Sequence, residues 1–353
     1  MIKKVYTIKD IAREAGVSPS LVSFALNNTL SPNGQKRYKV NDETARRIMA
    51  VAEKFNYKQN NAARSLRSRR SRAIGVILSD ISNPFFSSIA RRIEDEAFMA
   101  DYTVLFGSTD EKPEKLERLI RTFISKGVDG LIIVPCERSE RIIENLMEGN
   151  LPVVLLDRDV ESVAVNRVVL DNEAACGEAI CKLHEGGYRC IEMVSYDMEV
   201  SNIAHREAGY LAAMEQQGLG ACAHVHKIDY EQVEQSMAAC LASIDFTKTD
   251  ALLFATNSLS VAGVKALHRL GVEIPRQVGV VAFDGSEAFD LAPFSMACIK
   301  QPVGQFAHEA LSRVIYLIDH PDEAPVTHVL APTFVDGDSA YRKKAKINNE
   351  QNN

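Results

Sequence analysis

Apolar residues near the N-terminus repeat at the spacing of two short helices separated by a tight turn. The inner faces of these predicted helices consist of Ile8, Ile11, Ala12 and Ala15, followed by Leu21, Val22, Ala25 and Leu26. Thr7 and Asp10 form a capping-box pattern that opens the first helix. Gly16 supplies the positive φ that a sharp turn needs, and Ser18 followed by Pro19 starts the second helix. The pattern therefore predicts a helix-turn-helix.

The outer face of the second predicted helix carries mostly small side chains: Pro19, Ser20, Ser23, Phe24 and Asn27. A short helix with small polar groups pointing outward is suited to reading the major groove of DNA. Capped helix pairs also occur as plain packing units, so the motif alone leaves that alternative open. A third helix is predicted after Asn41, with its apolar face formed by Ala45, Ile48, Val51, Ala52 and Phe55. Three small helices around one core would make a self-sufficient helical head over residues 1–58.

From residue 73 onward, apolar β-rich runs alternate with amphipathic stretches. The predicted strands are 73–78, 103–106, 130–134, 152–156, 191–195, 251–255 and 278–283. The predicted helices are 85–100, 114–126, 138–148, 173–185, 203–217, 231–243 and 258–270. This order indicates parallel sheets with crossover helices on both faces. Because some 270 residues are too many for one compact core, we expect an α/β body of two doubly wound parallel-sheet lobes.

Charge separates the two parts of the chain. Residues 1–72 hold 16 basic and 5 acidic side chains, a formal charge of +11, and the whole chain carries −6, so residues 73–353 carry −17. A charge run is usually a solvated face. A basic module joined to an acidic body, however, favours nucleic-acid contact at the basic end.

At this point the chain resembles the lactose-repressor (LacI/GalR) family of bacterial transcription regulators. The N-terminal match is carried by Thr7, Ile8, Asp10, Ile11, Ala12, Ala15, Gly16, Val17, Ser18, Val22, Ser23, Leu26 and Asn27. Tyr57 and residues 61–66 extend it. Further matching segments are 74–76, 127–132, 157–158, 171–172, 206–210 and 280–284. The resemblance covers about residues 5–340, and its N-terminal motif is long enough to be highly specific.

The resemblance implies a periplasmic-binding-protein-like body joined to the head by a hinge over residues 59–72. It places Leu66 where the family wedges a leucine into the minor groove, and it adds Thr7, Ser18, Tyr57 and Ala63 to the candidate DNA contacts. The family's three crossings between lobes would fall near 157–171, 283–300 and 325–335. We therefore expect a first lobe at 73–160 and 298–340, a second at 161–297, and a polar tail at 341–353.

Two departures from the family pattern bear on DNA binding. Where many members carry arginine, this chain has Phe24, which offers only apolar contact, such as to a thymine methyl group. Residues 29–39 form an insertion whose basic side chains would contact phosphates or belong to a surface loop; the sequence favours neither. The tail has no leucine heptad, so a homodimer is expected rather than a coiled-coil tetramer.

Polar residues at strand ends mark a candidate ligand site, because ligands of open parallel sheets bind beyond the carboxyl ends of the strands. The candidate effector-binding residues are Asp80, Phe85, Asp157, Arg206, Tyr230, Asn257 and Asp284. Carboxylates, an amide and an arginine beside aromatic rings are suited to a polyol or a sugar. The resemblance places Asp157, Arg206, Asn257 and Asp284 at effector-binding positions. Each aspartate could instead cap a helix or bridge the lobes, and Asp171 with Asn172 is expected to cap a helix.

Other chemistries find little support in the sequence. Seven cysteines show no C-x-x-C pair, which suits reduced thiols in the cytoplasm, and no cofactor or metal is expected. His224 and His226 alternate along a predicted strand without evident partners. No apolar run approaches a membrane span, and no secretory segment is evident. We expect a cytoplasmic, ligand-responsive transcription regulator that binds double-stranded operator DNA and is not an enzyme. The alternatives are a sugar-binding or sugar-processing protein without DNA regulation.

Overall fold

The computed structural model describes residues 6–26, 40–57 and 70–342. The chain divides into two compact units, residues 1–69 and 70–353. The first unit contains the predicted head, and the second contains the predicted two-lobed body. The predicted hinge lies mostly outside the described residues.

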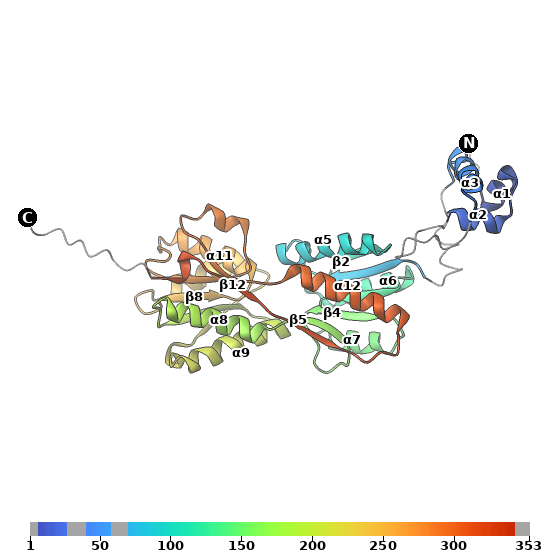
Figure 1. The fold of residues 1–353 in the computed structure, drawn as a ribbon. Helices are drawn as coiled ribbons and strands as arrows, with labels where there is room; N and C mark the ends of the chain where they lie inside the picture. Colours follow the sequence, from blue (N-terminus) through green and yellow to red (C-terminus); the bar gives the residue numbers. More distant parts are fainter. Residues whose placement is uncertain (1–5, 27–39, 58–69, 343–353) are drawn as a thin grey trace, which may run out of the picture. The chain divides into compact units, whose positions relative to one another are not determined.

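The head consists of three helices, α1 (Ile8–Ala15), α2 (Pro19–Leu26) and α3 (Asp42–Lys54) (Figure 1). Gly16 ends α1 with a φ of 65°, as the turn required. Ser18 Oγ accepts a hydrogen bond from the amide of Leu21 at 3.2 Å and thereby caps α2. Each helix buries one large aliphatic side chain completely in a shared core: Ile11, Val22 and Ile48. The predicted helix-turn-helix and third helix are confirmed.

The body contains two six-stranded sheets, each covered by helices (Figure 1). The first sheet has the strand order β11-β5-β4-β3-β1-β2, and all its neighbouring strands are parallel. Its strands are β1 (Ala73–Leu78), β2 (Thr103–Ser108), β3 (Gly130–Ile133), β4 (Val153–Asp157), β5 (Asn166–Leu170) and β11 (Thr327–Leu330). The helices of this lobe are α5 (Pro84–Met99), α6 (Pro113–Ser125), α7 (Glu140–Met147) and α12 (Val303–Asp319).

The second sheet has the order β12-β10-β9-β8-β6-β7, parallel except for β12, which runs antiparallel to β10. Its strands are β6 (Ile191–Tyr196), β7 (Val225–Ile228), β8 (Ala251–Phe254), β9 (Gly279–Phe283), β10 (Ala297–Lys300) and β12 (Thr333–Val335). The helices of this lobe are α8 (Asn172–Glu185), α9 (Ser201–Gln216), α10 (Val233–Ser243) and α11 (Asn257–Arg269). Short 3₁₀ helices lie at η1 (Gly220–Cys222), η2 (Glu287–Leu291) and η3 (Asp338–Ala340).

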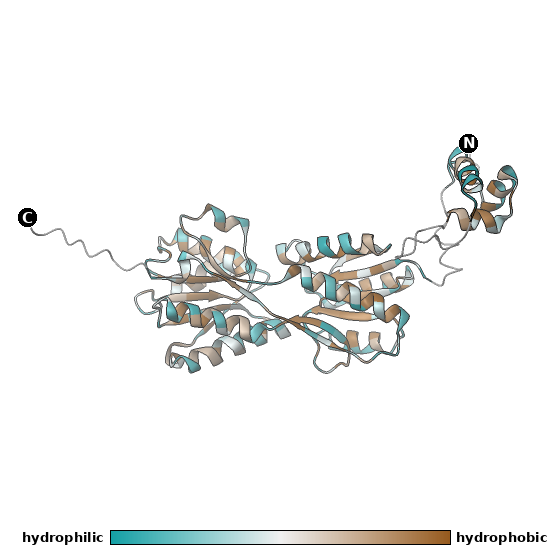
Figure 2. Ribbon diagram, in the orientation of Figure 1, coloured by the Kyte–Doolittle hydropathy of each residue, from teal (hydrophilic) through white to brown (hydrophobic). Residues whose placement is uncertain are grey.

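Central strands are apolar on both faces because helices cover both sides of each sheet. β3, β4, β8 and β9 are buried along their whole length. Figure 2 shows strands inside both lobes mostly in brown, with hydrophilic residues on the outer helices. Continuous burial of this kind is typical of parallel sheets. The predicted α/β architecture of two doubly wound lobes is confirmed.

The strand pairing moves the expected lobe boundaries. β5 pairs with β4 in the first sheet, so the first crossing follows Leu170 and not residue 160. β10 pairs with β9, so the second crossing lies at 301–302 and not before 300. After β11 the chain crosses again at 331–332, and β12 with η3 joins the second lobe. Residues 298–300 and 333–340, expected in the first lobe, therefore belong to the second.

His226 contacts a carboxylate on the neighbouring strand. Its Nε2 lies 2.5 Å from Glu192 Oε2 on the neighbouring strand β6. Within the described ranges, no group of three or more His, Cys, Asp and Glu side chains is placed to hold a metal ion. None of the helices described combines the length and apolar character needed to cross a bilayer.

The closely packed pair α8 and α9 provides a test of the second lobe (Figure 1). Replacing Gly209 with alanine is expected to lower the free energy of unfolding of the body by about 1–3 kcal/mol through overpacking. A Cβ at this position would lie 2.4 Å from the carbonyl oxygen of Glu173 and 2.5 Å from its Cα. Denaturant unfolding followed by circular dichroism measures the change.

Gly177→Ala on α8 is the matched control for this substitution. A Cβ at Gly177 would meet no atom within 4 Å. Because alanine favours the helix over glycine, this variant should be unchanged or more stable by up to about 1 kcal/mol. Equal destabilisation by the two substitutions would contradict a close approach of α9 to α8.

Candidate functional site

The start of α2 carries the exposed part of the predicted DNA-binding surface. Ser18, Pro19 and Ser20 are exposed, whereas Ser23 and Phe24 are half-buried on the same helix. Small, exposed polar residues at a helix start are compatible with entry into a groove of DNA.

Three candidate DNA contacts already interact with other residues of the head. Thr7 is exposed, and its Oγ1 donates to Asp10 Oδ2 at 2.7 Å. Ser18 Oγ is occupied by its capping bond. Tyr57 is half-buried and packs against the core of the head. Asn27, Ala63 and Leu66 lie outside the described residues.

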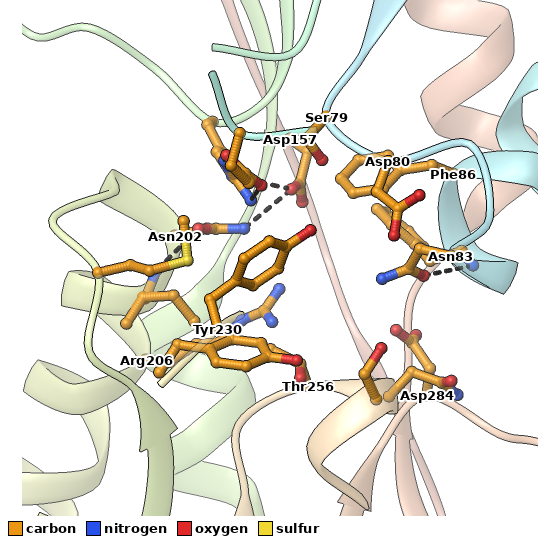
Figure 3. Close-up of a pocket in the computed structure, with 18 of the residues that line it drawn as sticks. Ser79, Asp80, Asn83, Phe86, Asp157, Asn202, Arg206, Tyr230, Thr256 and Asp284 are labelled. Carbon is orange, nitrogen blue, oxygen red and sulfur yellow. Dashed lines mark hydrogen bonds and ion pairs between the residues drawn. The ribbon is translucent and has the colours of Figure 1, made fainter. Parts of the chain in front are cut away.

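All seven candidate effector-binding residues line one cleft within the body, where the carboxyl ends of strands from both lobes face each other (Figure 3). Counting the part that opens to solvent, the empty space in the cleft is about 610 Å³. The sequence did not single out most of the other lining residues: Asn83, Phe86, Glu111, Arg158, Met198, Asn202, Ile203, Thr256, Ser258 and Gln301.

Arg206 extends from α9 into the floor of the cleft. Its Nε donates to Asn172 Oδ1 and its Nη1 to the carbonyl oxygen of Ala255, both at 2.8 Å. The guanidinium carbon lies 3.7 Å from the centroid of the Phe283 ring, a cation–π contact. Burial lowers the pKa of Arg206, while Asp157 and Asp284 act in the opposite direction. The arginine is therefore held rigidly by three elements of the second lobe.

Asp157 is the last residue of β4 and Asp284 directly follows β9, and the two have similar backbone geometry, with φ values of 66° and 64°. Aspartate adopts this left-handed conformation more readily than most residues. Burial raises the pKa of Asp157, and it raises the pKa of Asp284 to about 6. Both carboxylates thus carry a cost for staying ionised inside the protein.

Each of these aspartates is held by an amide side chain that the sequence analysis missed. Asn202 Nδ2 donates to Asp157 Oδ2 at 2.8 Å and joins α9 to the first lobe. Gln301, in the second crossing, donates from Nε2 to Asp284 Oδ2 at 2.9 Å. Buried acceptors remain without a partner among the described residues: Ser79 Oγ, Asp157 Oδ1 and Gln301 Oε1. A ligand with hydroxyl groups could satisfy them.

A buried ion pair forms part of the wall. Arg158 donates from Nη2 and Nη1 to the two carboxylate oxygens of Glu111, at 2.7 and 2.8 Å. Burial alone would lower the pKa of Arg158, but Glu111 raises it above the ordinary arginine value. Arg158 directly follows Asp157 in the sequence, and the segment 157–158, which resembles the family, was the signal for its position. The pair leaves neither charge available to a ligand.

Aromatic rings complete the cleft. Tyr196 and Tyr230 lie edge to face with their centroids 5.3 Å apart, and burial raises the pKa of both hydroxyls, so both stay neutral. Phe85 enters from α5 and packs edge-on against Phe306.

The remaining two candidates are the buried Asn257 and the half-buried Asp80. Asn257, the first residue of α11, donates from Nδ2 to the carbonyl oxygen of Gly285 at 3.0 Å. Asp80 follows β1, and its Oδ1 accepts bonds from the amide and hydroxyl of Ser82. Asp171 caps α8 as expected, through a bond from the amide of Ala174, whereas Asn172 holds Arg206.

The chemistry of the described lining residues suits binding better than catalysis. The lining includes no histidine, cysteine or lysine, so the usual pairing of a nucleophile with a base is missing from it. Burial raises the pKa of Cys176, near Arg206, to about 12, which keeps this thiol protonated. The cleft therefore offers hydrogen-bonding groups and aromatic faces.

Both units of the chain match families of known proteins. Residues 7–60 match the model of bacterial regulatory proteins of the lacI family, and residues 180–340 match a periplasmic binding protein-like domain. The ribose operon repressor of Halalkalibacterium halodurans is 31% identical over 301 residues, 84% of this chain and 86% of the relative. The ribose operon repressor of Bacillus subtilis is 30% identical over 349 residues, 96% of this chain and 99% of the relative.

A solved structure extends the comparison to the fold. The lac repressor dimer bound to operator and the anti-inducer ONPF superposes with a TM-score of 0.82, covering 96% of this chain and 100% of that chain at 20% identity. The head matches the family model, and the relatives match most of the chain. The chain therefore belongs to the lacI family of bacterial regulatory proteins, and it is a DNA-binding transcription regulator and not an enzyme.

Proposed function

We propose that this regulator is a repressor whose head binds operator DNA as part of a homodimer and whose cleft binds a small polyhydroxylated effector, in the first instance a sugar. The observation that carries the proposal is the convergence of Arg206, Asp157 and Asp284 in one cleft of a chain that also has a helix-turn-helix head. The names of the relatives support a sugar, since two of them are repressors of ribose operons. Such a protein would act in the cytoplasm, where bacterial DNA lies.

In the head, we propose that Ser20, Ser23 and Phe24 meet base edges in the major groove, together with Asn27. Ala63 and Leu66 of the hinge would meet the minor groove, where a leucine wedge kinks DNA. Thr7, Ser18, Pro19 and Tyr57 would position α2 against the phosphate backbone.

Coupling between the two functions would pass through the lobes. Three hydrogen bonds among the described residues join them beside the cleft. Asn202 Nδ2 donates to Asp157 Oδ2, the amide of Asp159 donates to Ser201 Oγ, and the amide of Glu199 donates to Glu137 Oε1. A ligand that contacts both lobes would shift their closure, and with it the arrangement of the two hinges in a dimer. The effector would thereby change operator affinity by favouring one arrangement over the other.

Selection of bound sites from random duplex DNA tests the DNA-binding part, using the full chain at two salt concentrations. We expect a roughly palindromic site and a steep loss of affinity with salt, because a dimeric head would neutralise several phosphates. Ser20→Glu should abolish the enrichment by placing a negative charge at the exposed start of α2. Ser312→Glu, on the exposed face of α12, is the matched control and should leave enrichment unchanged. Failure to enrich any site, with and without candidate sugars, would overturn the DNA-binding proposal.

A further inference from the structure

The charges that line the cleft are unequal. Four carboxylates, Asp80, Glu111, Asp157 and Asp284, face it, against the guanidinium groups of Arg158 and Arg206. Arg158 is neutralised by its bidentate pair with Glu111. The charges that remain for a ligand are therefore three carboxylates and one guanidinium, an excess of two negative charges when all are ionised.

The remaining guanidinium is already partly engaged by the protein. Arg206 already uses Nε and Nη1 for Asn172 and Ala255, and one of its faces lies on the Phe283 ring. Bidentate binding of a phosphate or carboxylate needs two free donors in one plane. Two of its five N–H groups are committed to hydrogen bonds among the described residues, and the three that remain are one on Nη1 and two on Nη2. Arg206 therefore offers donors to a ligand, but it brings only one positive charge against the three carboxylates.

The N-termini of helices also bind anions, but at this cleft some of their backbone amides already have side-chain partners. Asn83 Oδ1 accepts a hydrogen bond from the amide of Phe85 at the start of α5. Thr256 Oγ1 accepts the amide of Leu259 at the start of α11. Side-chain caps of this kind occupy the amides that would otherwise bind a phosphate.

The unpartnered buried atoms point to the complementary ligand. Among the buried lining atoms without a hydrogen-bond partner in the described residues, Ser79 Oγ, Asp157 Oδ1 and Gln301 Oε1 can accept, and two of these three can only accept. The one atom among them that can only donate is Arg158 Nε, which lies 4.0 Å from Asp157 Oδ2. Hydroxyl and ammonium groups donate to such acceptors, whereas a fully ionised phosphate only accepts. Figure 3 shows the Asp80 and Asp284 side chains on the side of the cleft opposite Tyr230, where a ligand between the lobes would meet both carboxylates.

We propose that the cleft accepts uncharged or amine-bearing polyhydroxylated ligands and excludes their phosphorylated and carboxylate-bearing counterparts, with Asp80 as a determinant of that charge selection. The inference rests on the proposed effector site. Asp80 contributes because it is half-buried beyond the carboxyl end of β1. In addition to burial, its charge raises the pKa of both Tyr196 and Tyr230 across the cleft. A phosphate group beside these carboxylates would be repelled in a medium of low dielectric constant.

Titration calorimetry on the full chain tests the selection with matched sets of ligands: aldoses and polyols, their amino derivatives, their phosphate esters and their aldonic acids. We expect at least one neutral or amino compound to bind, with its phosphate ester and acid at least 100-fold weaker. Equal or tighter binding of the phosphate or the acid would overturn the inference while supporting an effector site. Binding of no compound in any charge form would instead overturn the proposed sugar effector, and the inference with it.

Asp80→Asn separates repulsion from lack of space. The substitution keeps the size of the side chain. If charge is the cause of the exclusion, the affinity for the phosphate ester should rise at least 10-fold relative to the affinity for the unphosphorylated sugar. Asp101→Asn is the matched control, since Asp101 is exposed and outside the cleft. It should leave the ratio of the affinities for the phosphate ester and the unphosphorylated sugar unchanged. An unchanged ratio in Asp80→Asn would show that Asp80 does not select for charge.

Discussion

Replacing Arg206 with alanine is expected to abolish ligand binding and to lower the free energy of unfolding of the second lobe by about 3–5 kcal/mol. The guanidinium joins the start of α8, the end of β8 and the end of β9 through Asn172, Ala255 and Phe283. Its loss also leaves Asp157 and Asp284 without the cation that offsets their burial. Denaturant unfolding and titration calorimetry with a bound sugar measure the two effects.

Arg206→Lys separates the two contributions. Lysine restores a charge near the aspartates but lacks the planar fork, so it should recover part of the stability and little of the ligand affinity. Arg92→Ala, which removes an exposed arginine from α5, is the control and should change neither. A ligand dissociation constant unaltered in Arg206→Ala would remove this residue from the proposed effector site.

The clustering of the seven candidate residues could be predicted because of how parallel sheets are built. Asp80, Asp157 and Asp284 each follow a buried strand, and the carboxyl ends of parallel strands share one edge. Periodicity placed these three residues at strand ends, whereas the choice of Arg206 and Asn257 also rested on the family resemblance. The distances between the lobes and the partner of each side chain depend on tertiary packing, which periodicity does not encode.

The residues that the sequence analysis missed depend on contacts between distant segments. Asn202 bonds Asp157 from the other lobe, and Glu111 pairs with Arg158 from a loop 47 positions away. Gln301 lies in a crossing that was expected before residue 300, so its contact with Asp284 was not foreseen. Only a three-dimensional arrangement brings these pairs together.

Short strands account for most errors in the fold. β10, β11 and β12 span only three or four residues, too few for a clear alternation of polar and apolar positions. The helix α12 is a different case, because it was absent from the predicted helices although its apolar residues repeat at helical spacing. Its buried face consists of Phe306, Ala307, Ala310, Leu311, Val314 and Leu317. Here the signal was present in the sequence.

Asp284→Asn is expected to stabilise the body by up to about 3 kcal/mol at pH 7, and by almost nothing near pH 4. Burial raises the pKa of Asp284 from 3.8 to about 6. Between these values the folded chain binds more protons than the unfolded chain, so the contribution of this group to stability is present below pH 4 and is lost as the pH rises through 6. Asparagine does not ionise, and it tolerates the left-handed φ of 64° at this position.

The difference in unfolding free energy between Asp284→Asn and the unaltered chain, followed from pH 4 to pH 7, measures this effect. Asp101→Asn is the matched control for the backbone conformation, because Asp101 has a similar φ of 60° but is exposed. A difference for Asp284→Asn that is constant across this range would mean that the carboxyl does not titrate there. If the stabilised variant also binds the sugar more weakly, Asp284 is retained for the ligand at the expense of stability, as expected of a functional site.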